Sequence, residues 1–401
     1  MSKNKNIVKK VLYIGWVGFN NRGDDACLEF FRQHLNAALA ARDYRADIKA
    51  VYPSPSYQTN ITSLKPDLFV LGGGSVLGLP YISAMAAAQQ ADIPTITWGS
   101  GIDGLSDEVM NSLKSKTPLD ISTVYTDEHM LTSMIIRECP HVFVRGPYTR
   151  SFLHEITGGL TSATICGDPG LLMAADEIAG IPAPAALDTP PSSNSPANKD
   201  RRKLDLYEYV NAHSSGFIAV NWGTVLNKMY GRNEKGVAHQ LAEALKNISA
   251  VGLGHYPLLL YAMWPRDLPA LETLARLLGS PSHVQLLPWV PSLEEIALIL
   301  SRSVLSINLK LHGSIFSAAL GCPFICLAYR SKAFDFCASV ECEDVIVRTD
   351  DPHLGEAVWE RARKITNNMD RYRSRLITKR NLLKKELAGV IDTCCNLLIG
   401  D

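Results

Sequence analysis

The most informative absences in this chain of 401 residues are a long apolar run and an excess of one charge. Lysine plus arginine and aspartate plus glutamate each number 40, so no overall basic field favours nucleic acid or an anionic membrane. No apolar stretch approaches the roughly 18–20 residues that a membrane-spanning helix needs. The apolar stretch 11–19 follows several lysines but lacks a small-x-small cleavage site, so we interpret it as a buried strand. These absences predict a cytoplasmic protein without a transmembrane segment or a nucleic-acid partner.

Metal and nucleotide-cofactor signatures are also missing. The nine cysteines include no C-x-x-C pair, and no histidine-rich spacing accompanies them, which predicts buried free thiols and no metal site. The triple glycine at 72–74 is not followed by the Gly-Lys-Ser/Thr of a P-loop. The segment 99–104 matches G-x-G-x-x-G, but it lies in a later strand–helix unit, and no acidic strand end follows about 20 residues on. We therefore expect no bound cofactor.

What the chain does have is a long alternation of short apolar strands and amphipathic helices. The expected strands lie at 11–17, 47–52, 67–71, 94–98, 142–145, 163–166, 217–221, 257–262, 283–286, 303–307 and 323–327. The expected helices lie near 24–41, 80–90, 106–115, 128–137, 147–156, 235–251, 268–279, 292–301 and 312–320. This alternation is typical of parallel α/β sheets covered by helices on both faces, and the length suggests two domains.

A change in composition divides the alternation. Residues 177–203 are rich in proline, alanine and serine, and such a segment buries too little apolar surface to offset its ordering entropy. We predict an N-terminal α/β domain at 1–176, a flexible linker at 177–203, a C-terminal α/β domain at 204–353 and a helical tail at 354–401. The fold class is then α/β with two Rossmann-like, doubly wound domains, a glycosyltransferase-B-like arrangement.

The stretch 304–332 combines fold and chemistry most densely. It is typical of a strand, a turn, a helix ended by Gly321 and a second strand opened by Pro323. Lys310 and His312 fall where the first strand gives way to the helix. Because ligands bind at the carboxyl ends of strands in open α/β sheets, and a helix N-terminus there favours anions, we predict a phosphate or carboxylate site.

Other candidate residues follow strands in the first half. Asp24 and Asp25 begin the first helix, where an aspartate also serves as an N-cap. The glycines at 72–74 expose backbone N–H groups, and Arg145 ends a strand two residues before a helix-opening proline. An arginine at that place clamps a carboxylate or phosphate, or forms an ion pair on the surface.

Several short motifs, taken in order, resemble the polysaccharide pyruvyl transferase family. They are Asn21-Arg-Gly-Asp-Asp25, Gly72-Gly-Gly-Ser75, Gly99-Ser-Gly-Ile102, Val144-Arg145, Gly167-Asp-Pro169, Leu309-Lys-Leu-His-Gly313 and Tyr329-Arg-Ser-Lys332. The resemblance implies transfer of a pyruvyl group from phosphoenolpyruvate to two hydroxyls of a sugar, with release of phosphate and formation of a cyclic ketal. It also implies polysaccharide biosynthesis at the cell surface and phosphoenolpyruvate as co-substrate in place of a cofactor.

The resemblance also suggests roles for individual residues. His312 would act as the acid or base, because its unperturbed pKa of about 6.5 lies near working pH, and Asp24 would orient or deprotonate the acceptor. The donor would contact a set of cations and glycines: Lys310, Arg145, Lys332, Gly73 and Gly74. The acceptor cleft would include Asn21, Gly99 and Ser100. Lys310 stands where the family has arginine, so the charge is kept but the planar fork is lost.

Two other functions fit the same sequence. The first is a glycosyltransferase that uses a nucleotide-sugar, with Glu294 or Glu295 as the carboxylate for the donor ribose; the alternative for both is a favourable charge in the first helical turn. The second is a non-catalytic binding relative that kept the fold. A lipid-linked acceptor would place the protein at the inner face of the membrane, although no basic amphipathic anchor is evident.

Overall fold

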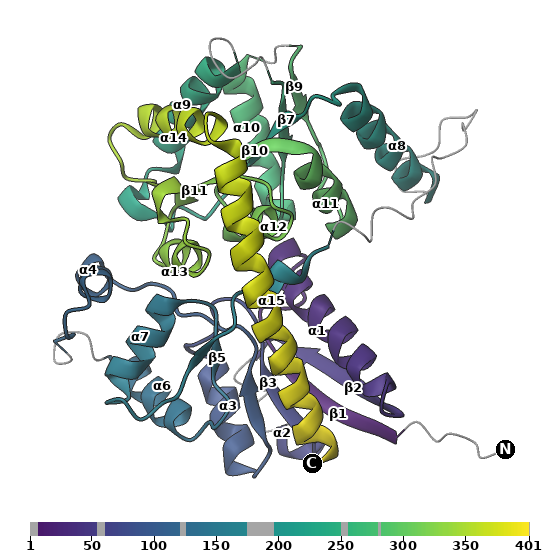
Figure 1. Cartoon of the computed structure of the whole chain (residues 1–401), viewed down its shortest axis with the longest axis vertical. Coiled ribbons are helices and arrows are strands. Elements are labelled where there is room, and N and C mark those ends of the chain that lie inside the picture. The colour runs from purple at the N-terminus through teal and green to yellow at the C-terminus, as the bar shows by residue number, and fades with distance from the viewer. Residues whose placement is uncertain are drawn as a thin grey trace. The chain divides into compact units, whose positions relative to one another are not determined.

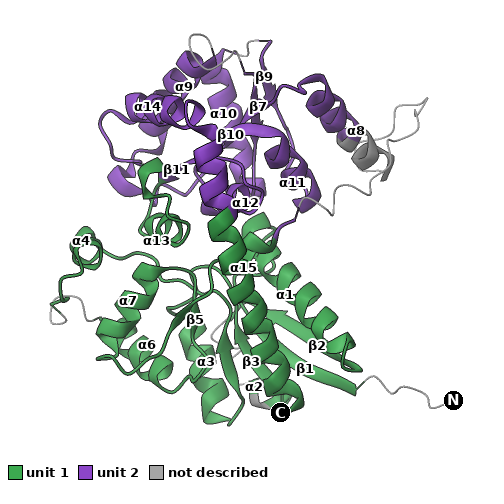
Figure 2. Ribbon diagram, viewed as in Figure 1, with its two compact units in different colours: residues 1–172, 328–346, 378–401 green, residues 173–327, 347–377 purple. Residues whose placement is uncertain are grey.

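The computed structural model describes residues 7–53, 61–120, 126–174, 196–249, 256–279 and 282–400. Two compact units divide the chain (Figure 2). Unit 1 comprises Met1–Leu172, Ala328–Ile346 and Thr378–Asp401, and unit 2 comprises Met173–Leu327 and Val347–Ile377. Each unit therefore contains segments that are far apart in the sequence.

Unit 1 is built on parallel strands in the order β2-β1-β3-β4, with a parallel pair β5-β6 (Figure 1). The strands are β1 (Ile7–Ile14), β2 (Tyr44–Val51), β3 (Leu68–Leu71), β4 (Thr95–Thr97), β5 (Phe143–Val144) and β6 (Thr164–Ile165). Isolated bridges from Ile96 to His141 and from Ser100 to Val144 connect the two groups of strands. Because β2 lies on one side of β1 and β3 on the other, the strand order reverses between β1 and β3.

Helices and short 3-10 turns accompany these strands in unit 1. They are α1 (Arg22–Ala40), α2 (Ile61–Leu64), α3 (Tyr81–Gln90), α4 (Asp107–Ser115), α6 (Asp127–Arg137), α7 (Pro147–Ile156), η2 (Pro169–Leu172), α13 (Lys332–Ser339) and η6 (Glu343–Val345). Two of them, α13 and η6, come from the distant segment 328–346. The sequence explains several of their ends. The Asn21 side chain accepts a hydrogen bond from the Gly23 N–H at the start of α1, and Pro147 opens α7.

Unit 2 contains a six-stranded sheet in the order β12-β11-β10-β7-β8-β9, and its pairs from β11 to β9 are parallel. Its strands are β7 (Phe217–Asn221), β8 (Leu258–Tyr261), β9 (Val284–Leu286), β10 (Ser303–Asn308), β11 (Phe324–Ala328) and β12 (Ile346–Arg348). Every residue of β7, β8, β10 and β11 is buried, as expected for strands covered on both faces.

The remaining helices belong to unit 2 or run from it into unit 1. They are α8 (Pro196–Ala212), η3 (Tyr230–Arg232), α9 (Glu234–Asn247), η5 (Pro265–Asp267), α10 (Leu268–Leu278), α11 (Leu293–Arg302), α12 (Leu311–Ala319), α14 (Leu354–Thr366) and α15 (Met369–Ile399). Helix α15 carries residues of both units. Among the described helices, none combines the length and apolar character that crossing a membrane requires.

The predicted fold class, two doubly wound α/β domains with a C-terminal helix, is confirmed. All eleven predicted strands are present: β7 has the predicted bounds, and the other ten differ from theirs by a few residues. The short α2, the helices α8 and α13, and β12 were not predicted. Residues 177–195 of the predicted linker lie outside the described residues, and 196–203 are helical as the start of α8, not linker. The domain boundaries stay a prediction, since the compact units follow spatial contacts and assign 328–346 to unit 1.

All nine cysteines are buried free thiols, as the sequence led us to expect. Seven lie in unit 1 and two, Cys322 and Cys326, lie in unit 2. Burial raises the pKa of several of these thiols, Cys27, Cys166 and Cys394 among them. They therefore behave as small apolar residues of the core.

Candidate functional site

The sheet of unit 2 has a reversal point of the kind that binds ligands in open α/β proteins. After β7 the chain builds β8 and β9 on one side, and then returns to place β10 and β11 on the other. The crevice outside the carboxyl ends of β7 and β10 is therefore the expected ligand position. Lys310 and His312 directly follow β10, as the sequence analysis predicted.

Lys310 is held at this point by three residues from the ends of β7 and β8. Its backbone N–H donates to the side-chain oxygen of Asn221, the last residue of β7, at 3.1 Å. Its Nζ donates to the backbone oxygen of Thr224 at 2.5 Å and lies 3.0 Å from Oδ1 of Asp267. The side chain of Lys310 is 16% exposed, while that of Asp267 is 0% exposed. An ammonium has three N–H donors, so one N–H remains for a ligand.

Asp267 was not predicted, although it determines the position of the lysine. Burial raises the pKa of this carboxyl group, and the nearby Lys310 opposes that shift. Oδ1 also accepts a hydrogen bond from the Thr224 N–H at 3.1 Å. A Cβ added at Gly223 would lie 2.2 Å from Cγ of Asp267, so a glycine is needed for the carboxylate to approach.

A second cation lies at the same strand ends. The guanidinium of Arg266 is 4.9 Å from the ring centroid of Trp264, and Nζ of Lys310 is 5.3 Å from that ring. Arg266 is exposed and has no ion-pair partner among the described residues. The two cations thus outnumber the one carboxylate, Asp267. Arg266 has a sequence signal that was overlooked, namely its position five residues after β8.

His312 is the second residue of α12, whose first N–H groups receive no side-chain cap from Lys310. Its ring lies 5.8 Å from that of Phe316, one turn further along the helix. A helix N-terminus carries a partial positive charge and free N–H donors, which favour anions. Within unit 2, Lys310, Arg266 and the start of α12 are therefore our candidate anion site, and His312 lies on the same helix start.

Unit 1 has its own reversal point, between β1 and β3, and the triple glycine lies there. The Tyr13 hydroxyl accepts a hydrogen bond from the Gly73 N–H at 3.1 Å. A Cβ added at Gly73 would lie 2.8 Å from Sγ of Cys27. Gly74 has a φ of +96°, and a Cβ added there would lie 3.1 Å from Oδ1 of Asp24. The loop therefore needs glycine to approach α1, and Asp24 lies against it.

Three predicted cleft residues have structural partners. The Asn21 side chain caps α1, as described above. The Ser100 hydroxyl is buried and donates to the backbone oxygens of Leu71 and Gly72 at 3.1 and 2.8 Å. Gly99 has φ of +63°, and a Cβ there would lie 2.5 Å from the Gly167 oxygen. Ser100 thus joins the two glycine loops, and contact of any of the three residues with an acceptor stays a prediction.

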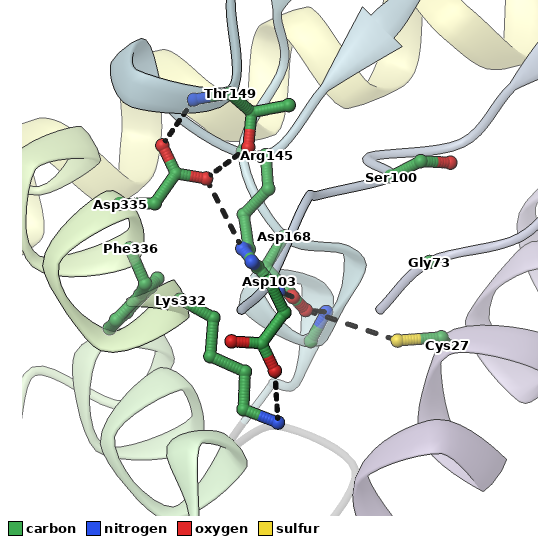
Figure 3. A network of polar contacts seen from close by, with 12 residues as sticks. Cys27, Gly73, Ser100, Asp103, Arg145, Thr149, Asp168, Lys332, Asp335 and Phe336 are labelled. Atoms are coloured by element: carbon green, nitrogen blue, oxygen red, sulfur yellow. Dashed lines mark hydrogen bonds and ion pairs between the residues drawn. The ribbon is translucent and has the colours of Figure 1, made fainter. Parts of the chain in front are cut away.

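Arg145 lies inside unit 1 in a closed network of charges (Figure 3). It is 1% exposed, with Nε 3.6 Å from Oδ2 of Asp335 and Nη1 4.0 Å from Oδ2 of Asp168. Asp335 also accepts hydrogen bonds from the Tyr148 and Thr149 N–H groups at the start of α7. As placed, Arg145 holds two carboxylates in the interior, and direct contact with a donor stays a prediction.

Lys332 belongs to a neighbouring, more open cluster (Figure 3). Its Nζ lies 3.5 Å from Oδ2 of Asp103, and Nε of Arg330 lies 3.1 Å from the same oxygen. Although burial alone would raise the pKa of Asp103, Lys332 and Arg330 lower it. Arg330 is 38% exposed and Lys332 18%. Asp103, Asp335 and Arg330 were not among the predicted site residues.

The carboxylates considered for a nucleotide ribose have a local explanation. Glu295 accepts a hydrogen bond from the Ser292 N–H at 2.6 Å, and the Ser292 hydroxyl accepts one from the Glu295 N–H at 3.2 Å. This reciprocal pair is a capping box at the start of α11. The alternative given for Glu295, a residue that stabilises its own helix, is the one that the structure supports.

Comparisons with known proteins agree with this architecture. A family model described as polysaccharide pyruvyl transferase matches residues 21–331, which is most of the chain. The comparison with curated proteins found no match. Among solved structures, S. aureus MnaA with UDP is 13% identical with a TM-score of 0.59, over 92% of this chain and 90% of that chain.

Two further structures show the same likeness. The UDP-GlcNAc 2-epimerase from Neisseria meningitidis, bound to UDP-GlcNAc, is 13% identical with a TM-score of 0.57, over 95% of this chain and 99% of that chain. A glycosyltransferase from Rickettsia africae is 12% identical with a TM-score of 0.54, over 99% of this chain and all (100%) of that chain. At these identities the likeness shows the fold alone, which is glycosyltransferase-B-like.

Proposed function

Because this chain belongs to the polysaccharide pyruvyl transferase family, we propose that it transfers a pyruvyl group from phosphoenolpyruvate to a sugar. In this reaction the methylene carbon gains a proton, two sugar hydroxyls add to C2, and the phosphate leaves to give a cyclic ketal. The acceptor is a sugar or a polysaccharide repeat, free or lipid-linked at the inner face of the membrane. The protein would thus serve the synthesis of surface or exported polysaccharides.

The observation that supports this proposal most directly is the anion site of unit 2. Phosphoenolpyruvate carries a carboxylate and a phosphate, and the site offers Lys310, Arg266 and the uncapped start of α12. Lys310 retains one N–H for a ligand after bonding Asp267 and Thr224. Charged donors of this kind hold anionic substrates and stabilise charge on a departing phosphate.

The proposed proton transfer uses His312. Histidine is the residue type that most often both donates and accepts protons in catalysis near neutral pH, which suits delivery to the methylene carbon. On unit 1, Asp24 is our candidate for accepting a proton from the acceptor hydroxyl. Lys332, with Arg330 beside it, is a further candidate for the donor carboxylate or phosphate, and Gly73 and Gly74 for backbone contacts to it.

The departure at Lys310 is compatible with this role. An arginine would offer two parallel N–H donors, whereas the lysine offers a single point charge on a flexible stem. Here Asp267 and the Thr224 carbonyl fix the ammonium in one place. That fixation restores part of the geometric definition that the planar fork of an arginine supplies.

The test is acceptor-dependent release of phosphate from phosphoenolpyruvate, measured with a panel of hexoses and hexosamines, with mass spectrometry to detect the ketal. His312→Ala should lower kcat by about 100- to 10,000-fold, the range for general acid–base groups. His239→Ala is the matched control, because His239 is an exposed histidine of α9 in the same unit. Normal turnover in His312→Ala would contradict the assignment.

A nucleotide-sugar glycosyltransferase on the same fold is the alternative that this design must separate. A thermal-shift comparison does so, because each ligand stabilises only a protein that binds it. Phosphoenolpyruvate should raise the melting temperature, and UDP should not. Stabilisation by UDP with no phosphate release would favour the glycosyltransferase, and stabilisation by phosphoenolpyruvate without turnover would favour a non-catalytic relative.

A further inference from the structure

Four aromatic side chains of unit 1 gather at the carboxyl ends of its first three strands. Trp16 and Phe19 lie in the loop that follows β1, Tyr52 follows β2, and Tyr81 opens α3 after β3. We call these four residues the aromatic platform. They surround the reversal point between β1 and β3, where an open α/β sheet places its ligand.

The four rings contact one another in a continuous set. Trp16 and Phe19 are stacked, with centroids 4.4 Å apart and planes 27° apart. Tyr52 meets both of them edge-on, at 5.3 and 5.2 Å. Tyr81 in turn meets Tyr52 edge-on at 6.0 Å. Such offset and edge-to-face contacts fix the orientation of rings.

Exposure differs within the platform. Trp16 is 36% exposed and Phe19 is 38% exposed, whereas Tyr81 is 7% exposed and Tyr52 is half-buried. The tyrosines thus form a base that holds two exposed rings in place. Single exposed apolar residues are ordinary on protein surfaces, but a contiguous, oriented group marks a binding surface. Gly18 (φ +90°) and Asn20 (φ +56°), on either side of Phe19, both have left-handed backbone conformations.

A carboxylate lies next to the platform. Asp24 is close enough to Tyr81 to contribute to the raised pKa of its hydroxyl, after burial and Tyr52. Its Oδ1 also lies beside Gly74, in the loop that follows β3. The platform therefore has the Asp24 carboxylate beside it.

This charge decides among ligands that favour aromatic surfaces. Phosphoenolpyruvate and nucleotides are anionic, so the Asp24 carboxylate repels them. A lipid chain offers no hydrogen-bond donor to this carboxylate, and burying the charge there is unfavourable. A neutral sugar has a face of C–H groups that packs on an aromatic ring, and hydroxyls that donate to carboxylates.

We propose that the aromatic platform binds a neutral sugar ring of the acceptor, stacked on Trp16 and Phe19, with Asp24 accepting a hydrogen bond from one of its hydroxyls. This inference rests on the proposed function in one respect, because it identifies the sugar as the pyruvyl acceptor. Trp16 and Phe19 act here as binding residues. Their loss affects the acceptor and leaves the donor untouched.

The experiment measures sugar binding without phosphoenolpyruvate. Saturation-transfer NMR on the full chain uses four probes: the methyl glycosides of galactose, glucose, mannose and N-acetylglucosamine. Wild type should transfer saturation to the ring protons of at least one probe. Trp16→Ala should weaken that binding about tenfold, the loss expected for one stacking contact. Trp16→Phe should retain most of it, and Trp359→Ala in unit 2 is the matched tryptophan control.

Any of three outcomes would contradict sugar binding at the platform. The wild type binds none of the four glycosides, or Trp16→Ala binds them with the same affinity as the wild type. The third outcome is that uridine binds more tightly than every glycoside and that its binding depends on Trp16. Circular dichroism shows whether Trp16→Ala is folded, and Phe19→Ala repeats the test if it is not.

The platform and the proposed function fail in different ways. If sugar binding depends on Trp16 but no phosphate is released, the platform is supported and the proposed pyruvyl transfer is wrong. If phosphate is released and Trp16→Ala leaves the KM for the acceptor unchanged, the pyruvyl transfer is supported and the proposed role of the platform is wrong. In an active enzyme we expect Trp16→Ala to raise the acceptor KM about tenfold and to leave the KM for phosphoenolpyruvate unchanged.

Discussion

Arg145 in unit 1 and Lys310 in unit 2 carry the same sequence signal and have different surroundings. Each is a cation at the carboxyl end of a strand, just before a helix. Arg145 is 1% exposed between two buried carboxylates, whereas Lys310 is 16% exposed and has one carboxylate partner. The two neighbourhoods differ in net charge, since Arg266 adds a second cation beside Lys310.

A cation at a strand end therefore indicates where a positive charge is needed, but it does not tell whether the charge stabilises the fold or binds a ligand. In unit 1 the charge neutralises Asp168 and Asp335, and Asp335 in turn caps α7. In unit 2 the charge is only partly neutralised and remains within reach of a ligand. Substitutions should therefore affect mainly stability at the first site and mainly activity at the second.

The largest expected effect is at the closed network. Arg145→Met leaves Asp168 and Asp335 buried without their cation, which should lower the free energy of unfolding by about 3–5 kcal/mol. Urea unfolding followed by circular dichroism measures it. Arg150→Met, an exposed arginine on α7, is the control and should change little. If Arg145→Met has an unchanged midpoint of urea unfolding but loses activity, Arg145 contacts a ligand, and the contrast drawn here between Arg145 and Lys310 is wrong.

Asp103 should show an intermediate effect that depends on pH. Asp103→Asn weakens the ion pairs with Arg330 and Lys332 and should lower stability by about 1–3 kcal/mol near neutral pH. The native pKa of Asp103 is lowered, so its contribution is fully present above its unfolded pKa of about 3.9 and is lost as pH falls through the native value.

Urea unfolding of wild type and Asp103→Asn at a series of pH values tests this sign. The difference in the free energy of unfolding between the two proteins should stay constant from neutral pH to about pH 5 and should shrink below about pH 3.9. Asp92→Asn serves as the control, because Asp92 has no ion-pair partner among the residues that the structure describes and lies in the turn after α3. A difference that grows on acidification would contradict the role of the two cations.

At the candidate anion site of unit 2, we expect a substitution to change the affinity for the substrate. Arg266→Gln should raise the KM for phosphoenolpyruvate about tenfold, the equivalent of about 1.4 kcal/mol, with little change in unfolding. The cause is the loss of an exposed cation that packs on Trp264. Arg276→Gln, an exposed arginine at the end of α10, is the matched control. Equal KM values in the two variants would place the donor elsewhere.

The smallest effect is expected for a carboxylate that serves its own helix. Ser292→Ala and Glu295→Gln each remove half of the capping box and should lower stability by about 0.5–2 kcal/mol. Neither should change kcat/KM, because the cap already accounts for both side chains. A selective loss of UDP binding in Glu295→Gln would instead favour the nucleotide-sugar alternative.

The sequence predicted the strands and long helices because their apolar periodicity is local. It also placed Lys310, His312 and the glycine loops at strand ends, where the structure has them. It missed the partners that decide each role, because these come from distant positions. Asp335 caps α7 across 187 positions, and Thr224 holds Lys310 across 86.

Short elements were the other source of error. Helix α13 has 8 residues and β12 has 3, which is too short for a period of 3.6 or 2 to be recognised. The start of α8 follows a proline-rich stretch and has a composition that favours disorder. The aromatic platform was missed for a different reason: its members come from three separate strand ends, and only the β-sheet brings them together.

Because the cysteines are buried in both units, their alkylation reports which unit has unfolded. A thiol-alkylating reagent reacts with the thiolate, so burial and raised pKa values should leave the native chain nearly unlabelled. Opening of unit 2 alone exposes two thiols, and opening of unit 1 alone exposes seven. The mass added in a labelling pulse would therefore distinguish which unit unfolds first.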